Sequence, residues 1–218
     1  TSAAIAVATI AAYTRLLGHD LEAHEIARLG HATEVEVQGA ASAMDTAIST
    51  LGGTILIRPM RTKPQIENVD LPASLPSVIG YTEREAKTAD LLRRVRSLCE
   101  SSPKVVDSLM AAIGNCVEDG RTALMKGDLA GLGRLMNINH GLLEALGVSS
   151  KRLNEMVYSA RSAGALGSKM TGAGGGGCMF ALCPEKEDEV SIAIKVVGGE
   201  PFRATLSGAG VRLESIDK

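Results

Sequence analysis

A glycine-rich run near the end of the chain is the stretch whose residue types point most directly to a chemistry. It lies between two segments of β-strand composition and reads Thr171-Gly172-Ala173-Gly174-Gly175-Gly176-Gly177-Cys178. Glycines let the backbone adopt positive φ and approach a ligand closely, and successive amides in such a loop can point at one anion. The run therefore predicts a phosphate-binding loop, with an ordinary flexible turn as the alternative.

Two carboxylates nearer the start of the chain, Glu34 and Asp45, form a second candidate group. A loop of small residues separates them, and Gly52-Gly53 follows. A carboxylate at the start of a short helix can accept a hydroxyl proton or orient the hydroxyl, which is the role predicted for Asp45. A second carboxylate can bind Mg²⁺ together with nucleotide phosphates, which is the role predicted for Glu34. The alternative is that Asp45 is a helix N-cap and Glu34 a solvated helix residue.

The first residues of the chain, Thr1 and Ser2, place hydroxyl side chains at the start of a helix. A helix N-terminus offers unpaired N–H groups and a dipole that favours phosphate, although the same residues could be a plain N-cap. A helix start, a Mg²⁺ carboxylate, a hydroxyl-facing aspartate and a glycine-rich loop are together the parts of a phosphoryl-transfer site.

Hydrophobic periodicity and turn residues predict the elements that must position these groups. Helices are expected over 2–17, 21–36, 45–51, 87–98, 105–125, 129–146, 151–163 and 187–197. Strands are expected over 54–59, 77–81, 168–171, 178–182 and 202–206. The proline-containing segment 61–76 shows no periodicity and is expected to be a linker or a long connection. Interleaved helices and strands of this kind favour an α+β fold built on an antiparallel sheet.

Composition excludes several classes of partner. The 23 Lys and Arg against 25 Asp and Glu leave a formal charge of −2, and aromatic residues are 2% of the chain, so no basic field or stacking platform for nucleic acid is expected. The sequence shows neither a membrane span nor a signal peptide. The four cysteines and four histidines lack zinc-ligand spacing, and a reducing, cytoplasmic location is predicted.

The order of these motifs resembles that of the GHMP kinases. Ser-Ala-Ala opens a helix, a glutamate precedes G-A-A-S-A-M-D and D-T-A-I-S-T-L-G-G, and S-K-M-T-G-A-G-G-G-G-C completes the series. The glycine run is similar to that of the mevalonate kinase group within the family, the archaeal members in particular, whereas galactokinases, phosphomevalonate kinases and homoserine kinases carry other forms. Further similarity runs through 131–137 and 142–148, so the resemblance covers nearly the whole chain.

The resemblance implies a two-part α+β architecture. It consists of an incomplete ribosomal-protein-S5-like N-terminal domain over 1–72 and a ferredoxin-like C-terminal domain over 73–218, with the active site expected between them. The family's first motif, which carries an active-site lysine, and the P-x-G-x-G-L-G part of its second motif are expected to precede Thr1. We therefore expect that the chain lacks its natural N-terminus and is nearly inactive by itself, because it lacks that cation and the loop that holds the ATP phosphates.

The resemblance also implies a reaction and its participants. The reaction is the ATP- and Mg²⁺-dependent phosphorylation of the C5 hydroxyl of mevalonate, a step of isoprenoid biosynthesis. Asp45 matches the catalytic aspartate, while Ser2 and Glu34 match the residues that contact Mg²⁺. The residues expected on the ATP side are Thr1, Ser2, Gly172, Ala173, Gly174, Gly175 and Gly176, and those expected nearest the substrate are Thr171 and Ala173.

Other interpretations stay open at this point. The chain could belong to another GHMP alcohol kinase, such as a phosphomevalonate kinase or a galactokinase-like enzyme, or it could be a non-catalytic truncated binding module. A homodimer is compatible with the resemblance, because many members of the family are dimers. One departure from the family pattern is Ala43, which stands where many relatives have glycine and is tolerable if its φ is negative.

Overall fold

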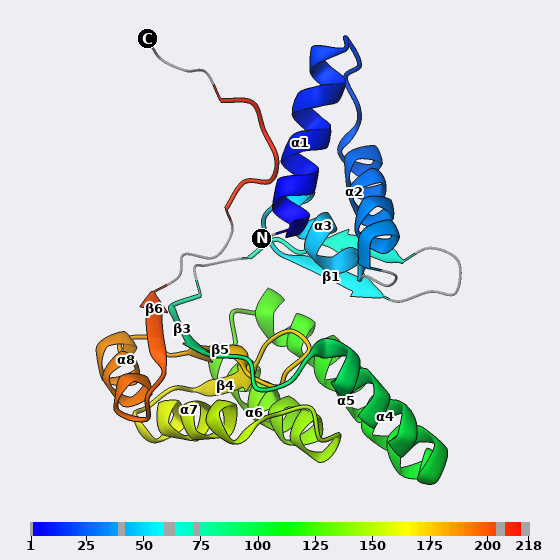
Figure 1. Ribbon diagram of the computed structural model, residues 1–218. Helices are drawn as coiled ribbons and strands as arrows, with labels where there is room; N and C mark the ends of the chain where they lie inside the picture. The colour runs from blue at the N-terminus through cyan, green and yellow to red at the C-terminus, as the bar shows by residue number, and fades with distance from the viewer. Residues whose placement is uncertain (1, 39–41, 59–63, 72–74, 204–207, 215–218) are drawn as a thin grey trace. The chain divides into compact units, whose positions relative to one another are not determined.

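The computed structural model describes residues 2–38, 42–58, 64–71, 75–203 and 208–214 of the chain (Figure 1). The chain forms two compact units. Unit 1 comprises residues 1–71 and 206–218, and unit 2 comprises residues 72–205. The predicted border near residue 72 thus lies beside the division between the units, but the end of the chain belongs to unit 1, whereas the expected second domain runs to Lys218.

Unit 1 is built from three helices and a β-hairpin. The helices are α1 (Ser2–Leu16), α2 (Ala23–Gln38) and α3 (Ala43–Leu51), and the antiparallel hairpin pairs β1 (Ile55–Arg58) with β2 (Gln65–Asn68). Ala3 and Val7 lie one turn apart on α1 and are both buried, as are Ile26 of α2 and Ala47 of α3. The small side chains on α1 let the three helices pack closely around this core.

The C-terminal segment of unit 1 packs against the end of α3. The Gly53 amide donates to the Gly208 carbonyl over 2.9 Å, and the Val211 amide donates to the carbonyls of Ser49 and Thr50 over 3.0 and 3.2 Å. The carbonyls of a last helical turn have no partner within the helix, so an extended segment can satisfy them. A Cβ on Gly52 would lie 2.2 Å from the Gly210 amide nitrogen, so only glycine allows this approach. These hydrogen bonds explain why the chain end returns to unit 1.

Unit 2 is a four-stranded antiparallel sheet with helices. Its strands are β3 (Ser77–Thr82), β4 (Gly167–Met170), β5 (Gly177–Leu182) and β6 (Glu200–Arg203), in the spatial order β4-β5-β3-β6. Its helices are α4 (Thr88–Ser101), α5 (Pro103–Met125), α6 (Leu129–Ala145), α7 (Lys151–Ser162) and α8 (Glu187–Val196). Four helices, α4 to α7, connect β3 to β4, and α8 connects β5 to β6. If the four helices are taken as one crossover, this order and the strand arrangement match the expected ferredoxin-like fold. The aliphatic core includes Val78, Leu153, Met156, Val157, Met179, Val190 and Ile194.

The helices and strands predicted from periodicity are confirmed, with ends that differ by a few residues. The predicted strand 202–206 overlaps β6 at residues 202 and 203, and its residues 204–206 lie outside the described residues. The predicted strand 54–59 ends at a proline outside the described residues. The prediction for 61–76 is wrong, because β2 lies inside the expected linker. Four residues are too few to establish a period, and β2 is held by backbone pairing with β1, from Ile55 opposite Asn68 to Arg58 opposite Gln65.

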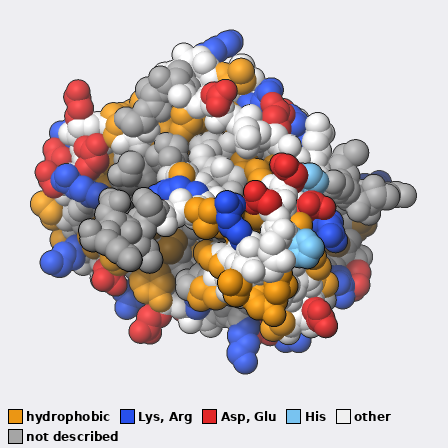
Figure 2. All heavy atoms as spheres, turned by 90° about the horizontal axis from the view of Figure 1, so that it is seen from above, with side chains coloured by type: hydrophobic (Ala, Val, Ile, Leu, Met, Phe, Trp, Pro, Cys, Tyr) orange, Lys and Arg blue, Asp and Glu red, His pale blue; other side chains and the backbone are white. Residues whose placement is uncertain are grey.

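Hydrophobic side chains reach the surface among acidic and basic ones on the face drawn in Figure 2. On α1, Tyr13 is 61% exposed and Leu16 is 81% exposed. Helix α1 thus buries a narrow stripe at Ala3 and Val7 and leaves these larger apolar side chains exposed.

None of the helices in the described ranges is long and apolar enough to cross a membrane.

The buried His140 on α6 should make the stability of unit 2 depend on pH. The Met170 amide donates to Nδ1 of His140, so the imidazole is neutral in this arrangement. Burial lowers the pKa of His140 below its ordinary value of 6.5, and the nearby Arg161 and Lys169 charges lower it further, while Glu144 and Asn154 oppose the shift. The unfolded chain therefore binds a proton at His140 more readily than the folded chain does. The contribution of the neutral His140 to the free energy of unfolding is complete above pH 6.5 and decreases as the pH falls toward the lowered pKa of the folded state.

We therefore expect the free energy of unfolding of the wild-type chain to fall more steeply on acidification, below about pH 6.5, than that of the His140→Asn variant. Urea unfolding followed by circular dichroism at a series of pH values measures both slopes. Because the carboxylates titrate in both proteins, equal slopes would show that His140 contributes nothing to the acid sensitivity.

Candidate functional site

Ser2 and Glu34, two of the predicted metal-binding residues, are in direct contact in unit 1. The Ser2 hydroxyl donates to Oε1 of Glu34 over 2.7 Å. The Glu34 side chain is buried, with 8% of the residue exposed, although it lies on α2 among exposed neighbours. Burying a carboxylate is unfavourable unless a partner compensates, and the hydroxyl is such a partner. The alternative that Glu34 is a solvated helix residue is therefore wrong.

Gly30 explains how Glu34 reaches the start of α1. The two residues are one turn apart on α2 and share a face. A Cβ on Gly30 would lie 3.2 Å from Cγ2 of Val7 and 3.4 Å from Cγ2 of Thr46, so the missing side chain lets α2 approach both α1 and α3. Gly30 was not among the predicted site residues. A glycine inside a helical pattern is the sequence signal that could have identified it.

Asp45 lies in the first turn of α3, where the helix dipole favours a negative charge. The N-cap of α3 is Ser42, whose Oγ accepts a hydrogen bond from the Met44 amide over 3.2 Å, so the alternative that Asp45 is the N-cap is wrong. Asp45 is exposed and makes no hydrogen bond or ion pair to any residue that the structure describes. Its carboxylate is thus available to a ligand, on a helix anchored by the buried Thr46.

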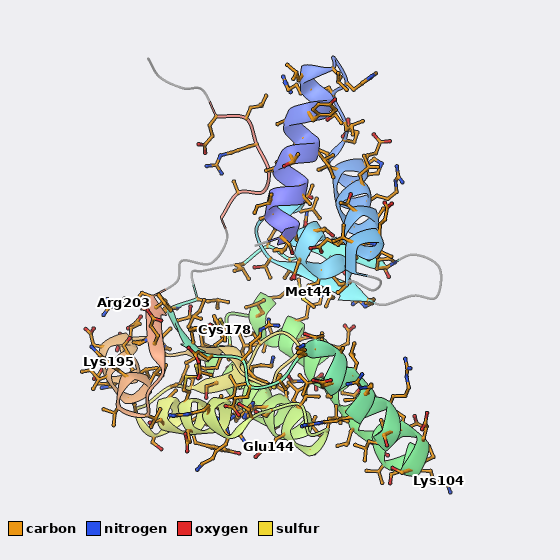
Figure 3. All side chains as sticks on the ribbon, viewed as in Figure 1. Met44, Lys104, Glu144, Cys178, Lys195 and Arg203 are labelled. Carbon is orange, nitrogen blue, oxygen red and sulfur yellow. The ribbon has the colours of Figure 1, made fainter. Side chains whose placement is uncertain are left out.

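Ala43, which stands where the resemblance implies a glycine, causes no backbone strain. Ala43 is the first residue of α3, and its φ is not positive. Met44, labelled in Figure 3, follows it and is 52% exposed. The backbone before Asp45 therefore needs no glycine at this position.

The glycine-rich loop joins β4 to β5 in unit 2, and its backbone has the predicted conformation. The five glycines all have positive φ, with values of +67° for Gly172, +88° for Gly174, +65° for Gly175, +101° for Gly176 and +88° for Gly177. Other residues rarely adopt this region, so the run of glycines is a conformational requirement. Cys178, labelled in Figure 3, is the second residue of β5, which follows the loop.

The loop is fixed on both sides by the backbone of other segments. The Gly175 amide donates to the Val148 carbonyl over 2.9 Å, and the Gly175 carbonyl accepts from the amides of Glu85 and Ala86 over 2.7 and 3.1 Å. A Cβ on Gly174 would lie 2.0 Å from the Val148 carbonyl oxygen. An ordinary flexible turn has no such supports. Residues 83–86 and Val148 are thus parts of the site that sequence reasoning did not identify, because they are distant along the chain.

Three consecutive amides of the loop remain available to a ligand. Those of Gly172, Ala173 and Gly174 donate to no residue within the described ranges. The Thr171 amide and hydroxyl, by contrast, both donate to the Cys178 carbonyl, over 2.9 and 3.1 Å, and close the base of the loop. Consecutive free N–H groups in a concave backbone can bind an anion such as phosphate.

Lys169 adds a basic group two residues before the loop. Its Nζ donates to the Met170 carbonyl over 2.9 Å, and burial lowers its pKa. It was not among the predicted site residues, although it belongs to the S-K-M-T-G-A-G motif on which the resemblance rests.

Ser2 and Glu34 can hold Mg²⁺ only if phosphates or water supply the remaining ligands of the ion. No group of three or more His, Cys, Asp or Glu side chains that could hold a metal occurs among the described residues. A single carboxylate with a neighbouring hydroxyl, as in Glu34 and Ser2, suits Mg²⁺, which takes its remaining ligands from phosphates and water. Thr1 lies outside the described residues. Ser2, Glu34 and Asp45 all belong to unit 1, and residues 171–177 belong to unit 2.

Comparison with known protein families gives matches at both ends of the chain. Residues 1–53 match the GHMP kinases N terminal domain, and residues 121–198 match GHMP kinases C terminal. The two matches together cover more than half of the chain, and they include Ser2, Glu34, Asp45 and the glycine-rich loop.

Individual relatives match over nearly the whole chain. The mevalonate kinase of Thermococcus onnurineus is 47% identical over an alignment of 221 positions, which covers 99% of this chain and 65% of the relative. The mevalonate kinase of Saccharolobus solfataricus is 37% identical over 97% of this chain and 65% of the relative. The crystal structure of L. major mevalonate kinase in complex with R-mevalonate superposes with a TM-score of 0.87 at 30% identity, covering 96% of this chain and 66% of that protein. The chain thus spans about two thirds of the length of these relatives.

Proposed function

Because this chain belongs to the GHMP kinase family, we propose that it supplies most of an ATP-dependent small-molecule kinase whose acceptor is the C5 hydroxyl of mevalonate. The observation that supports this acceptor is the 47% identity to a mevalonate kinase over 99% of the chain. Solved homoserine kinase and galactokinase structures share the fold at 24% and 21% identity. The product would be 5-phosphomevalonate, an intermediate of isoprenoid biosynthesis.

The described residues divide the work of phosphoryl transfer among themselves. Asp45, exposed on the first turn of α3, would orient the acceptor hydroxyl or remove its proton. Ser2 and Glu34 would hold Mg²⁺, which neutralises charge on the ATP phosphates when it is bound. The free amides of Gly172, Ala173 and Gly174 would donate to phosphate oxygens, and Thr171 would lie near the acceptor.

An exchange chimera tests this function. In the exchange chimera, the Thermococcus onnurineus relative keeps its own unmatched part and carries this chain in place of the matched region. We expect it to phosphorylate mevalonate in the presence of ATP and Mg²⁺, and to be far less active on galactose, phosphomevalonate and homoserine. The 218-residue chain alone, assayed in parallel, is expected to be nearly inactive. Preference for another of the four acceptors would replace the proposed substrate, and inactivity on all four would favour a non-catalytic binding module.

The proposed Mg²⁺ role of Glu34 gives a separate prediction. Glu34→Gln in the exchange chimera keeps the side-chain volume and the partner for the Ser2 hydroxyl but removes the charge. We expect the Mg²⁺ concentration for half-maximal activity to rise about tenfold or more, since one charged ligand is lost. Glu36→Gln, an exposed position two residues further on α2, is the matched control and should behave like the wild type. An unchanged Mg²⁺ dependence in Glu34→Gln would remove Glu34 from the metal site.

We also propose a cytoplasmic location and a homodimer. All four cysteines are unpaired, as expected for a reducing compartment. Light scattering coupled to gel filtration measures the oligomeric state of the exchange chimera, and a monomeric mass at assay concentration would exclude the dimer.

A further inference from the structure

The strand that leads into the glycine-rich loop, β4, lies at the edge of the four-stranded sheet. The outward backbone groups of an edge strand have no neighbouring strand to pair with. Here side chains replace that strand. Asn137 accepts from the Ser168 amide over 3.0 Å and donates to the Leu166 carbonyl over 3.2 Å, Arg161 donates to the Ser168 carbonyl over 2.8 Å, and His140 accepts from the Met170 amide over 3.3 Å.

Two glycines make these hydrogen bonds possible. A Cβ on Gly133 of α6 would lie 2.5 Å from the Leu166 carbonyl carbon, and a Cβ on Gly167 of β4 would lie 2.2 Å from the Gly133 carbonyl oxygen. Helix and strand backbones are therefore in direct contact. Asn137 and His140 lie four and seven residues after Gly133, on the same face of α6, so their short side chains can reach the strand.

Arg161 is fixed by contacts of its own. Its Nε donates to the Ser168 hydroxyl over 3.2 Å, and that hydroxyl donates in turn to the Val157 carbonyl over 2.8 Å. Its guanidinium lies 5.0 Å from the centre of the Tyr158 ring. The Tyr158 hydroxyl donates over 3.0 Å to Glu144, which Figure 3 labels on α6. The guanidinium thus has little freedom to leave β4.

We propose that Asn137, His140 and Arg161, here called the edge clamp, are positioning residues for the glycine-rich loop. The Met170 amide held by His140 is the last outward N–H group of β4, two residues before Gly172. Holding it fixes the place and direction in which the chain enters the loop, and so the aim of the free amides at Gly172, Ala173 and Gly174. The structural part of this proposal is independent of the reaction, whereas its consequence for turnover rests on the proposed kinase function.

The structural part is tested in the 218-residue chain by amide hydrogen exchange. His140→Leu places an apolar side chain at the buried position and removes the acceptor, while His140→Asn offers Oδ1 in place of Nδ1. We expect the hydrogen-bonded amides of Met170 and Thr171 to exchange about tenfold faster in His140→Leu and close to the wild-type rate in His140→Asn. Unchanged exchange in His140→Leu, or equally fast exchange in both variants, would overturn the clamp.

Asn137 keeps the proposal testable if His140→Leu does not fold. Asn137→Asp retains the acceptor for the Ser168 amide and loses the donor to the Leu166 carbonyl, whereas Asn137→Leu loses both. Faster exchange of the Ser168 amide is expected in Asn137→Leu and not in Asn137→Asp. The same rate in the two variants would contradict the assigned hydrogen bonds.

The consequence for turnover is measured in the exchange chimera. His140→Leu should lower kcat for mevalonate phosphorylation about tenfold, and His140→Asn should restore most of it, because misplacement of site groups costs rate. A loss of activity that His140→Asn does not restore, or exchange that accelerates without any change in kcat or KM, would refute the positioning role. If the unmutated exchange chimera is inactive on mevalonate, the proposed function fails, and the exchange data still decide whether the clamp exists.

Discussion

Replacing Asp45 by asparagine should lower kcat of the exchange chimera by about 10²- to 10⁴-fold, the range expected when a general base is lost. The carboxylate is exposed, has no partner among the described residues and stands in the first turn of α3, so it is free to meet an acceptor hydroxyl. Asparagine keeps the shape and removes the proton acceptor. Binding of ATP, measured by calorimetry, should change little, because the proposed contact of Asp45 is with the acceptor.

A matched control separates catalysis from helix stability. Asp90 occupies the first turn of α4, as Asp45 does in α3, and pairs with Arg93. Asp90→Asn should cost a similar small amount of stability through the helix dipole, about 0.5 kcal/mol, and leave kcat unchanged. If Asp45→Asn also kept its kcat, Asp45 would lose its proposed role. If both variants lost activity, the effect would be one of folding.

Replacing Gly174 by alanine should disrupt the loop between β4 and β5 and abolish most of the activity. The new Cβ would lie 2.0 Å from the Val148 carbonyl oxygen, and φ is +88°. Because the obstacle is backbone and not a movable side chain, we expect the free energy of unfolding of unit 2 to fall by about 4 kcal/mol or more. Urea unfolding of the 218-residue chain measures this loss, and the exchange chimera measures the activity.

Gly172→Ala is the control for Gly174→Ala. Gly172 also has positive φ, at +67°, but a Cβ there would meet no atom within 4 Å. Its substitution should therefore show only the backbone strain of a non-glycine residue, about 1 kcal/mol. Equal destabilisation by the two substitutions would mean that the contact with Val148 does not hold the loop. Since Gly172 carries one of the free amides, a loss of activity without a matching loss of stability in Gly172→Ala would indicate ligand contact.

Local features of the fold could be predicted because local residue patterns cause them. The 3.6-residue periodicity and the following Gly18 are enough to place α1, and the glycines of 172–177 announce a loop with positive φ. Strand β2 could not be predicted from periodicity, because its four residues are held by pairing with β1 and show no pattern of their own. The end of the chain was expected in the second domain, but residues 208–211 lie against the end of α3, where they satisfy carbonyls that have no partner within the helix.

The sequence by itself determined the class of fold, the family resemblance and the identity of the candidate groups, because residue type and spacing along one element are local properties. Only the tertiary structure decided which of them have partners. It buries Glu34 against Ser2 through the close packing at Gly30 and fixes the loop between residues 83–86 and Val148, whereas Asp45 has no partner among the described residues. It also places Asn137, His140 and Arg161 on the edge of β4. Contacts between residues far apart in the chain depend on how helices and strands pack, and no single segment of the sequence encodes that packing.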